Sequence, residues 1–350
     1  MYTIRDIARL AQVSTATVSF VINQKGKVSE PLRQRVLDAM KTLDYHPDQV
    51  ARSLKVRRTQ TIGVVIPDVS APFFAEVMMG IEDEAHKLGY SVIFCNTNND
   101  PELENRHLDI LYSRRVDGVL ISSYLLRAGE GRLVKRRFPT VFFDRTPPAY
   151  SGAAVVSDNL EASRNATGHL IKLGHTHIAI ITGPLDMPLC TDRLEGFRQA
   201  LQEASLPLHN EYLKCGDFKL ESGYRTGREL MQLPTPPTAV FCCNDKMTLG
   251  LMRALGELSI PCPERVSVVS FDDFEWVASF RPYLTTVAQP THLMGKRATE
   301  ILVRKIQQDG APSEDPEERV VVLPNELRIR ESTAPPYRRS PRKVTSRERV

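Results

Sequence analysis

Aromatic side chains and strongly hydrogen-bonding side chains follow the apolar runs of residues 61–289, where they could bind a small polar ligand. The eight candidates are Asp68, Phe73, Phe74, Arg145, Arg193, Phe218, Asn244 and Asp272. Carboxylate, guanidinium and amide groups hydrogen-bond to hydroxyls, and an aromatic ring offers an apolar face, so the set suits a sugar. A second fixed cation, Arg145, placed beside Arg193 could select a sugar acid or a sugar phosphate through bidentate pairing.

Several of these candidates also have a structural interpretation. Asp272 could cap a helix, and Phe73 and Phe74 could be core residues. Asp144 and Arg145 are adjacent in the chain and could form an exposed ion pair.

The elements that must position these residues are strands alternating with amphipathic helices from residue 61 onward. The strand runs are TIGVVIP, GYSVIFC, GVLIS and TVFFD, and the same alternation restarts after Asp158 with HIAIIT, AVFCC and VSVVSF. Buried runs of this kind predict parallel α/β sheets. Two similar halves imply a cleft between them, and ligands in such sheets lie beyond the carboxyl ends of the strands.

The first 45 residues predict three short helices. Thr3 and Asp6 form a capping box, Ser14 is a natural N-cap for the second helix, and Ser29 with Pro31 begins the third. Three short helices with a tight first turn describe a helix-turn-helix module.

The two ends of the chain are basic and the middle is acidic. Residues 1–60 hold 11 Lys and Arg against 5 Asp and Glu, and residues 331–350 hold 6 against 2, within a net charge of +4 for the whole chain. Only the ends suit a polyanion such as DNA, although a basic run is more often a solvated surface.

The segments TIRDIARLAQVSTATVSFVIN and VSEPLRQRVLDAMKTLDYHPDQVARSLK resemble the lactose-repressor/galactose-repressor (LacI/GalR) family of bacterial transcription regulators. The resemblance implies that the second helix enters the major groove. Thr15, Ala16 and Phe20 would then face base edges. The implied phosphate and flanking contacts come from Thr3, Ser14, Thr17, Asn23 and Ser29.

Phe20 departs from better-known members of the family, in which a polar or basic residue is common at this position. An apolar contact with a thymine methyl group is plausible there. The alternative is that Phe20 packs on the third helix.

Residues 47–55 are most similar to the hinge of purine repressors. In that hinge, paired helices enter the minor groove and a leucine wedges between base steps, a role that would fall to Leu54 here, with Ala51 and Lys55 beside it. The wedge unstacks the bases, and this cost is compensated because the bent duplex wraps more of the protein surface. Alternatively, Leu54 packs between domains.

The body of the chain resembles the family core, which shares its fold with periplasmic sugar-binding proteins. The expected fold is therefore an N-terminal all-α helix-turn-helix module plus a two-lobed, periplasmic-binding-protein-like α/β core with parallel sheets. We expect a helix-turn-helix domain at 1–46, a hinge helix and linker at 47–60, a first lobe at 61–158 and 290–317, a second lobe at 159–289 and 318–333, and a disordered basic tail at 334–350.

Other classes of protein have little support in the sequence. The motifs GxGxxG, GxxxxGK[ST], GxSxG and HExxH are absent, so we expect no enzyme, no cofactor and no metal site. His175 and His177 precede a strand and are expected at the surface. The six cysteines lack CxxC spacing and are expected to be buried free thiols. No apolar run approaches the about 18 residues of a membrane span, and the chain starts without a signal peptide, which disfavours a periplasmic sugar-binding protein.

The resemblance implies a cytoplasmic repressor that binds double-stranded, pseudo-palindromic operator DNA as a homodimer. Its operator affinity would be controlled by a sugar, a sugar acid or a sugar phosphate bound between the lobes. The alternative is a regulator co-repressed by a purine or nucleoside. Relatives include both induced and co-repressed regulators. The resemblance therefore does not decide whether the effector weakens or strengthens binding to the operator.

Overall fold

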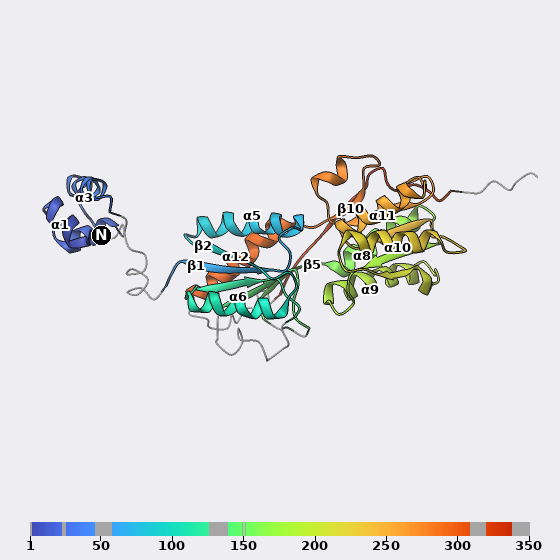
Figure 1. Cartoon of the computed structure of the whole chain (residues 1–350), viewed down its shortest axis with the longest axis horizontal. Helices are drawn as coiled ribbons and strands as arrows, with labels where there is room; N and C mark the ends of the chain where they lie inside the picture. Colours follow the sequence, from blue (N-terminus) through green and yellow to red (C-terminus); the bar gives the residue numbers. More distant parts are fainter. Residues whose placement is uncertain are drawn as a thin grey trace, which may run out of the picture. The chain divides into compact units, whose positions relative to one another are not determined.

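The computed structural model describes residues 2–22, 26–45, 58–125, 139–148, 150, 152–308 and 320–337. The chain divides into two compact units, Met1–Thr59 and Gln60–Val350 (Figure 1). Within the described ranges, no helix is long and apolar enough to cross a membrane.

The described part of the first unit contains the three predicted helices, α1 (Ile4–Ala11), α2 (Thr15–Ile22) and α3 (Glu30–Thr42). The Asp6 carboxylate accepts a hydrogen bond of 2.9 Å from the Thr3 backbone N–H, which fixes the start of α1. Ile7, Val18 and Val36, one from each helix, are fully buried in a shared core. The helices are short and depend on this shared core rather than on their own propensity.

The second unit holds two lobes, each built on a six-stranded sheet. The first sheet has the strand order β11-β5-β4-β3-β1-β2 and the second has the order β12-β10-β9-β8-β6-β7. All pairings are parallel except that of β12 with β10. The described elements of the first lobe are β1 (Thr61–Ile66), α5 (Pro72–Lys87), β2 (Ser91–Asn96), α6 (Pro101–Ser113), β3 (Gly118–Ile121), β4 (Thr140–Phe143), β5 (Ala154–Ser157), α12 (Thr291–Gln307) and β11 (Val320–Leu323).

The second lobe follows the same alternation. Its elements are α8 (Asn159–Lys172), β6 (Ile178–Thr182), α9 (Pro188–Glu203), the 3-10 turn η1 (Asn210–Tyr212), β7 (Leu213–Cys215), α10 (Leu220–Met231), β8 (Ala239–Cys242), α11 (Asp245–Glu257), β9 (Ser267–Phe271), η2 (Glu275–Ala278), β10 (Thr285–Ala288) and β12 (Glu326–Arg328). The helices pack as the pairs α8 with α9 and α10 with α11 (Figure 1).

Helix α12 returns to the first lobe, as predicted, and packs tightly against α5. A side-chain carbon on Gly80 would lie 2.1 Å from the backbone oxygen of His292, and one on Gly295 would lie 2.1 Å from the backbone oxygen of Val77. Only glycine permits this approach of the two backbones. The α5–α12 pair covers one face of the first sheet, and α6 packs against strands β1 and β2 of that sheet.

The chain passes between the lobes three times, and the three crossings are hydrogen-bonded to one another. The backbone N–H of Asp158 donates to the Leu323 carbonyl at 2.9 Å, and Asn325 Nδ2 donates to the Asp158 carbonyl at 3.0 Å. Ser157 Oγ donates to Gln289 Oε1 at 2.6 Å. The crossings therefore form one connected hinge rather than three separate linkers.

One predicted boundary between the lobes is wrong. Strand β11 pairs in parallel with β5, with Val320 opposite Ala154, so it belongs to the first lobe and not to the second lobe predicted from residue 318. The final crossing instead follows Leu323. Strands β5, β10, β11 and β12 were not among the predicted strands. Length is not the reason, because the predicted strands β3, β4 and β8 are also only four residues long.

Residues 334–337 are packed on the second lobe, whereas disorder was expected from residue 334. His175 Nε2 lies 2.9 Å from the Ala334 carbonyl oxygen, and the backbone N–H of Ala334 donates to Ser267 Oγ at 3.0 Å. The Arg265 guanidinium lies 5.0 Å from the centre of the Tyr337 ring. His175 is 1% exposed, so its predicted surface position is also wrong. The rest of the tail lies outside the described residues.

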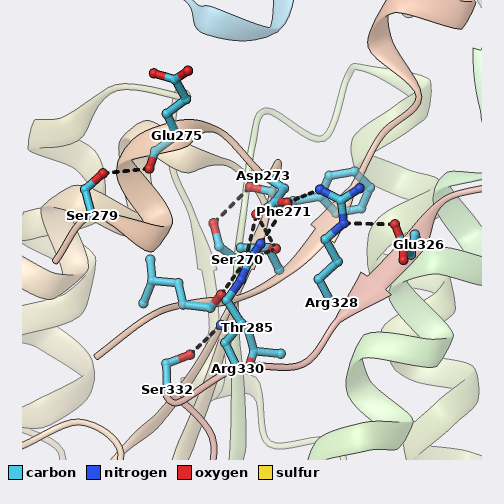
Figure 2. Close-up of polar contacts among 12 residues, drawn as sticks. Ser270, Phe271, Asp273, Glu275, Ser279, Thr285, Glu326, Arg328, Arg330 and Ser332 are labelled. Atoms are coloured by element: carbon cyan, nitrogen blue, oxygen red, sulfur yellow. Dashed lines mark hydrogen bonds and ion pairs between the residues drawn. The ribbon is translucent and has the colours of Figure 1, made fainter. Parts of the chain in front are cut away.

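A buried carboxylate ties the last strand to the second lobe (Figure 2). Asp273 accepts hydrogen bonds from Arg330 Nη1 at 2.7 Å and from Thr286 Oγ1 at 2.8 Å, and it also pairs with Arg328. Burial by itself raises the pKa of Asp273, but the bonds from Arg330, Arg328 and Thr286 outweigh burial and hold that pKa below its usual range.

We expect Asp273→Asn to lower the free energy of unfolding at pH 7 by about 1–3 kcal/mol, because Arg330 loses its anionic partner. The native pKa is lowered, so this stabilisation is present above about pH 4, the usual Asp pKa, and is lost as the pH falls through the native pKa. Urea unfolding at pH 7, 5 and 3.5 measures the difference. Glu326→Gln, which alters an exposed partner of Arg328, is the matched control and should change stability by less than about 1 kcal/mol. Equal effects of both changes would contradict the assignment.

Candidate functional site

A cavity of about 290 Å³ lies between the two lobes of the second unit. It is lined by all eight residues that the sequence predicted for a ligand site: Asp68, Phe73, Phe74 and Arg145 from the first lobe, and Arg193, Phe218, Asn244 and Asp272 from the second. Its volume is close to the lower end of the roughly 300–1,000 Å³ typical of ligand pockets. The structure thus brings residues from across the chain to one concave site suited to a small molecule.

Arg193 is the most deeply embedded cation of the cavity, with 3% of its surface exposed. Its Nε donates to Asn159 Oδ1 at 2.8 Å and its Nη1 donates to the Cys243 carbonyl at 2.6 Å. The guanidinium carbon lies 3.5 Å from the centre of the Phe271 ring. Two of the five N–H groups and one face are used in this way, so the guanidinium is held in a fixed orientation at the cavity wall.

Asp272 follows β9 directly and has a left-handed backbone, with φ of 76°. Its Oδ1 accepts a hydrogen bond of 2.6 Å from Gln289 Nε2. Burial, followed by the nearby Asp245 carboxyl, raises the pKa of Asp272 to about 7 against the opposing charge of Arg193. Near neutral pH the carboxyl group is therefore poised between its two forms and can donate to or accept from a ligand hydroxyl. Asp272 lines the cavity. The other interpretation of the sequence was that Asp272 caps a helix.

Asp144 and Arg145 are not an exposed pair, because their side chains are 8% and 11% exposed. Arg145 Nη1 donates to Asn99 Oδ1 at 2.8 Å, and Arg145 Nε lies 3.6 Å from Asp144 Oδ2. The guanidinium carbon is 5.6 Å from the centre of the Phe74 ring and 5.7 Å from that of Phe218. Burial raises the pKa of Asp144, and the charge of Arg145 partly offsets this effect.

Asp68 forms an ion pair across the cavity with Lys246, whose Nζ lies 3.0 Å from Asp68 Oδ2. Burial tends to raise the pKa of Asp68, but hydrogen bonds from Ser70 and Lys246 outweigh it and the pKa is lowered. On the opposite wall, Asn244 caps α11 by accepting a 2.9 Å bond from the Met247 N–H. The carboxylate of Asp68 is thus engaged in holding the two lobes together.

The aromatic residues both line the cavity and pack against apolar side chains. Phe73 and Phe74 meet edge to face, with ring centres 5.1 Å apart, and both pack into the core of the first lobe while lining the cavity. Phe218 has a φ of 65°, and its ring would lie 2.2 Å from a side-chain carbon on Gly183. Glycine at position 183 therefore leaves the space that the Phe218 ring occupies.

The cavity also includes residues that the sequence analysis missed, among them Asn98, Asn99, Tyr124 and Gln289. Asn98 and Asn99 follow β2 as polar residues, so the rule that selected the other candidates could have found them. Gln289 gave no such signal, because it stands at a crossing between lobes. Across the residues that the structure describes, no group of three or more His, Cys, Asp and Glu side chains is placed to hold a metal ion.

In the first unit, α2 presents Thr15, Ala16 and Phe20 to solvent, and Phe20 is 49% exposed. Ser14 Oγ accepts a 3.0 Å bond from the Thr17 backbone N–H, which caps α2. Phe20 lies outside the set of residues that makes up the core of this unit.

The remaining residues predicted to contact DNA divide into two groups. Thr3 and Ser29 are exposed beside the starts of α1 and α3. Asn23, Ala51, Leu54 and Lys55 lie outside the described residues.

Comparison with known proteins gives matches over both units. Residues 3–48 match the family model for bacterial regulatory proteins of the lacI family, and residues 167–333 match a periplasmic binding protein-like domain. The HTH-type transcriptional repressor PurR of Actinobacillus pleuropneumoniae serotype 5b (strain L20) is 39% identical over 310 residues, which is 88% of this chain and 92% of that protein.

Two solved structures are similar over almost the whole chain. The transcriptional regulator CelR in complex with cellobiose is 32% identical with a TM-score of 0.71, over 95% of this chain and 100% of that one. The lac repressor dimer bound to operator and the anti-inducer ONPF is 28% identical with a TM-score of 0.84, over 95% and 99% of the two chains.

We expect Asp272→Asn to stabilise the ligand-free protein above neutral pH. The native pKa of about 7 exceeds the usual value of about 3.9, so the contribution of the protonated group is complete below about pH 4 and is lost as the pH rises through 7. Asn is never charged, still accepts the bond from Gln289, and tolerates the left-handed backbone. The variant should be more stable at pH 8, by at most about 4 kcal/mol, and this advantage should vanish near pH 4. Urea unfolding at several pH values measures the free energy of unfolding of both proteins. If that free energy changes with pH in the same way for both, the raised pKa of Asp272 is wrong.

Proposed function

Because the chain belongs to the lacI family of bacterial regulatory proteins, we propose that its affinity for operator DNA is controlled by a neutral sugar bound in the cavity between the lobes. The observation that supports the sugar most directly is the fixed set of Arg193, Asp272 and Asn244 around one cavity with the rings of Phe74 and Phe218. The guanidinium of Arg193, from α9, and the carboxyl group of Asp272, just after β9, suit adjacent hydroxyls, and the rings suit the apolar face of a sugar.

A neutral ligand is favoured over a sugar acid or a sugar phosphate by the charges already in the cavity. The cavity lining holds five carboxyl groups against four basic side chains, so it offers no surplus of positive charge to a further anion. Lys246 is already paired with Asp68, and Arg145 already lies beside Asp144. The second cation at position 145 is therefore not enough to select an acidic ligand.

A purine or nucleoside is the second candidate effector. The rings of Phe74 and Phe218 come from different lobes and both face Arg145, with the distances of 5.6 and 5.7 Å given above. Because an aromatic ring from each lobe lines the cavity, its walls suit a flat heterocycle as well as a sugar.

On the DNA side, we assign α2 to the major groove, with Thr15, Ala16 and Phe20 at the base edges. Ser14 and Thr17, at the start of α2, are assigned to phosphates together with Thr3 and Ser29. A homodimer would present two such modules to the half-sites of a pseudo-palindromic operator. The protein would act in the bacterial cytoplasm, at the nucleoid. Asn23, Ala51, Leu54 and Lys55 complete this proposal from the sequence alone.

The link from ligand to DNA is proposed to run through the hinge. Gln289 donates to Asp272 and accepts from Ser157, so one side chain joins the cavity to two crossings. A ligand that binds Asp272 would thereby favour one arrangement of the lobes. Since coupling is reciprocal, operator DNA must change ligand affinity by the same factor.

Phe20 should read a thymine methyl group, which can be tested on an operator selected from random DNA. Phe20→Ala should weaken binding to this operator about tenfold or more and leave nonspecific binding and the salt dependence unchanged, because no phosphate contact is lost. Replacing the contacted thymine by uracil removes the methyl group and should weaken the native protein while leaving the variant unaffected. If Phe20→Ala weakens specific and nonspecific binding alike, Phe20 is not a base-reading residue.

The effector class can be tested by thermal unfolding with neutral sugars, sugar acids, sugar phosphates and purines. A neutral sugar at 100 times its Kd should add about 2.7 kcal/mol to the stability of the native protein. Arg193→Lys should abolish the shift, because lysine lacks the planar fork. The matched control is Arg198→Lys, at an exposed position of the same helix. A shift with purines alone would favour the second candidate, and a shift confined to acids or phosphates would refute the neutral sugar.

A further inference from the structure

A second cavity, of about 170 Å³, adjoins the ligand cavity near the hinge. Its walls include Thr146, Tyr150 and Val320 from the first lobe, and Ser157 and Asn159 at the crossing between the lobes. Accommodating one water requires only about 10–15 Å³ measured in this way. The second cavity therefore has room for a molecular group rather than a single water.

The two cavities are separated by side chains that line both of them. These shared residues are Tyr124, Arg145, Met187 and Leu189. Met187 and Leu189 pack with Tyr124 and Phe218 in a small apolar cluster. Unbranched methionine and arginine side chains can change rotamer without moving the backbone. The partition can therefore open without a change of fold.

Arg145 leaves one hydrogen-bonding group unused at this partition. Its Nε is buried and makes no hydrogen bond within the described ranges, and the nearest charged group is the Asp144 carboxylate, whose Oδ2 lies 3.6 Å away. Its Nη1 is held by Asn99. A buried donor without a hydrogen bond is costly. A turn of the Arg145 side chain at the partition would expose this Nε to an oxygen of a ligand that spans both cavities.

The walls of the second cavity have the chemistry of a sugar subsite. Thr146 and Tyr150 supply hydroxyl groups, Asp192 supplies a carboxyl group, and Val320 contributes an apolar surface. The Ser157 hydroxyl and the Asn159 amide are already hydrogen-bonded to other residues of the chain. Hydroxyls both donate and accept hydrogen bonds, as the hydroxyls of a neutral sugar require.

We propose that the two cavities are subsites of one binding site, so that the effector is a disaccharide or a comparable glycoside with its second unit beyond Arg145. This inference rests on the proposed neutral-sugar function. It adds that a single sugar ring fills only part of the site. Arg145 then acts as a specificity residue between the two units rather than as an anion receptor.

Filling the second cavity from strand β11 tests the proposal. Val320 lines the second cavity but not the first, and Val322 lines neither. The two valines are 44% and 53% exposed and stand two residues apart on the same strand, so both positions should accept a larger side chain. Val320→Trp is the test variant and Val322→Trp is its matched control. Val320→Phe is the smaller substitute if Val320→Trp lowers the thermal midpoint of the ligand-free protein.

The probes are glucose, galactose and ribose as single units, and cellobiose, lactose, maltose and melibiose as double units, measured by titration calorimetry with the full chain. We expect one disaccharide to bind the native protein at least about tenfold more tightly than any single unit, a difference of about 1.4 kcal/mol. Val320→Trp should remove this advantage and leave monosaccharide binding unchanged. Val322→Trp should keep both.

The outcomes distinguish failure of the two-subsite proposal from failure of the proposed neutral-sugar function. Binding of monosaccharides with no gain for any disaccharide overturns the second subsite and leaves the sugar function intact. A disaccharide advantage that survives Val320→Trp also overturns it. If no sugar of either size binds, the neutral-sugar function fails, and the two-subsite inference fails with it.

Discussion

The buried positive charge of Arg193 is the constraint on which the ligand cavity depends. A guanidinium that is 3% exposed must be compensated by hydrogen bonds and by nearby polar groups. Its partners are Asn159, at the start of α8, and the Cys243 carbonyl, just after β8, and its face lies on Phe271 at the end of β9. One side chain therefore fixes the relative positions of three elements at the mouth of the cavity. The same charge partly offsets the burial of Asp144 and Asp272.

Adjacent carboxyl groups show how strongly the local environment decides chemistry in this lobe. Asp272 and Asp273 are neighbours in the chain, yet the pKa of Asp272 rises to about 7 while that of Asp273 falls below its usual range. Asp273 is surrounded by donors from Arg330, Arg328 and Thr286, which favour its charged form. Asp272 faces Asp245 and receives one bond from Gln289. The carboxylate of Asp273 therefore has a structural role, whereas the carboxyl group of Asp272 remains available for a ligand.

Side chains of the cavity are connected to the hinge between the lobes. Gln289 connects Asp272 to Ser157, and the pair of Asp68 and Lys246 spans the cavity from lobe to lobe. Under the proposed function, a bound molecule that contacts these groups would change the balance between arrangements of the lobes, since a ligand shifts an equilibrium by its difference in affinity for the two states. In a repressor of the lacI family, such a shift provides a physical route from the effector to the operator.

The sequence by itself determined most of the local elements and eight residues of the cavity lining. Capping at Thr3 and Ser14 and the apolar runs of the predicted strands depend on near neighbours in the chain. The eight cavity residues were accessible because the carboxyl ends of parallel strands gather at one edge of a sheet. Tertiary structure alone decided the rest: the place of β11, the burial of His175, the pairing of Asp68 with Lys246, and the second cavity beyond Arg145. Each of these depends on contacts between residues far apart in the chain, which local periodicity cannot encode.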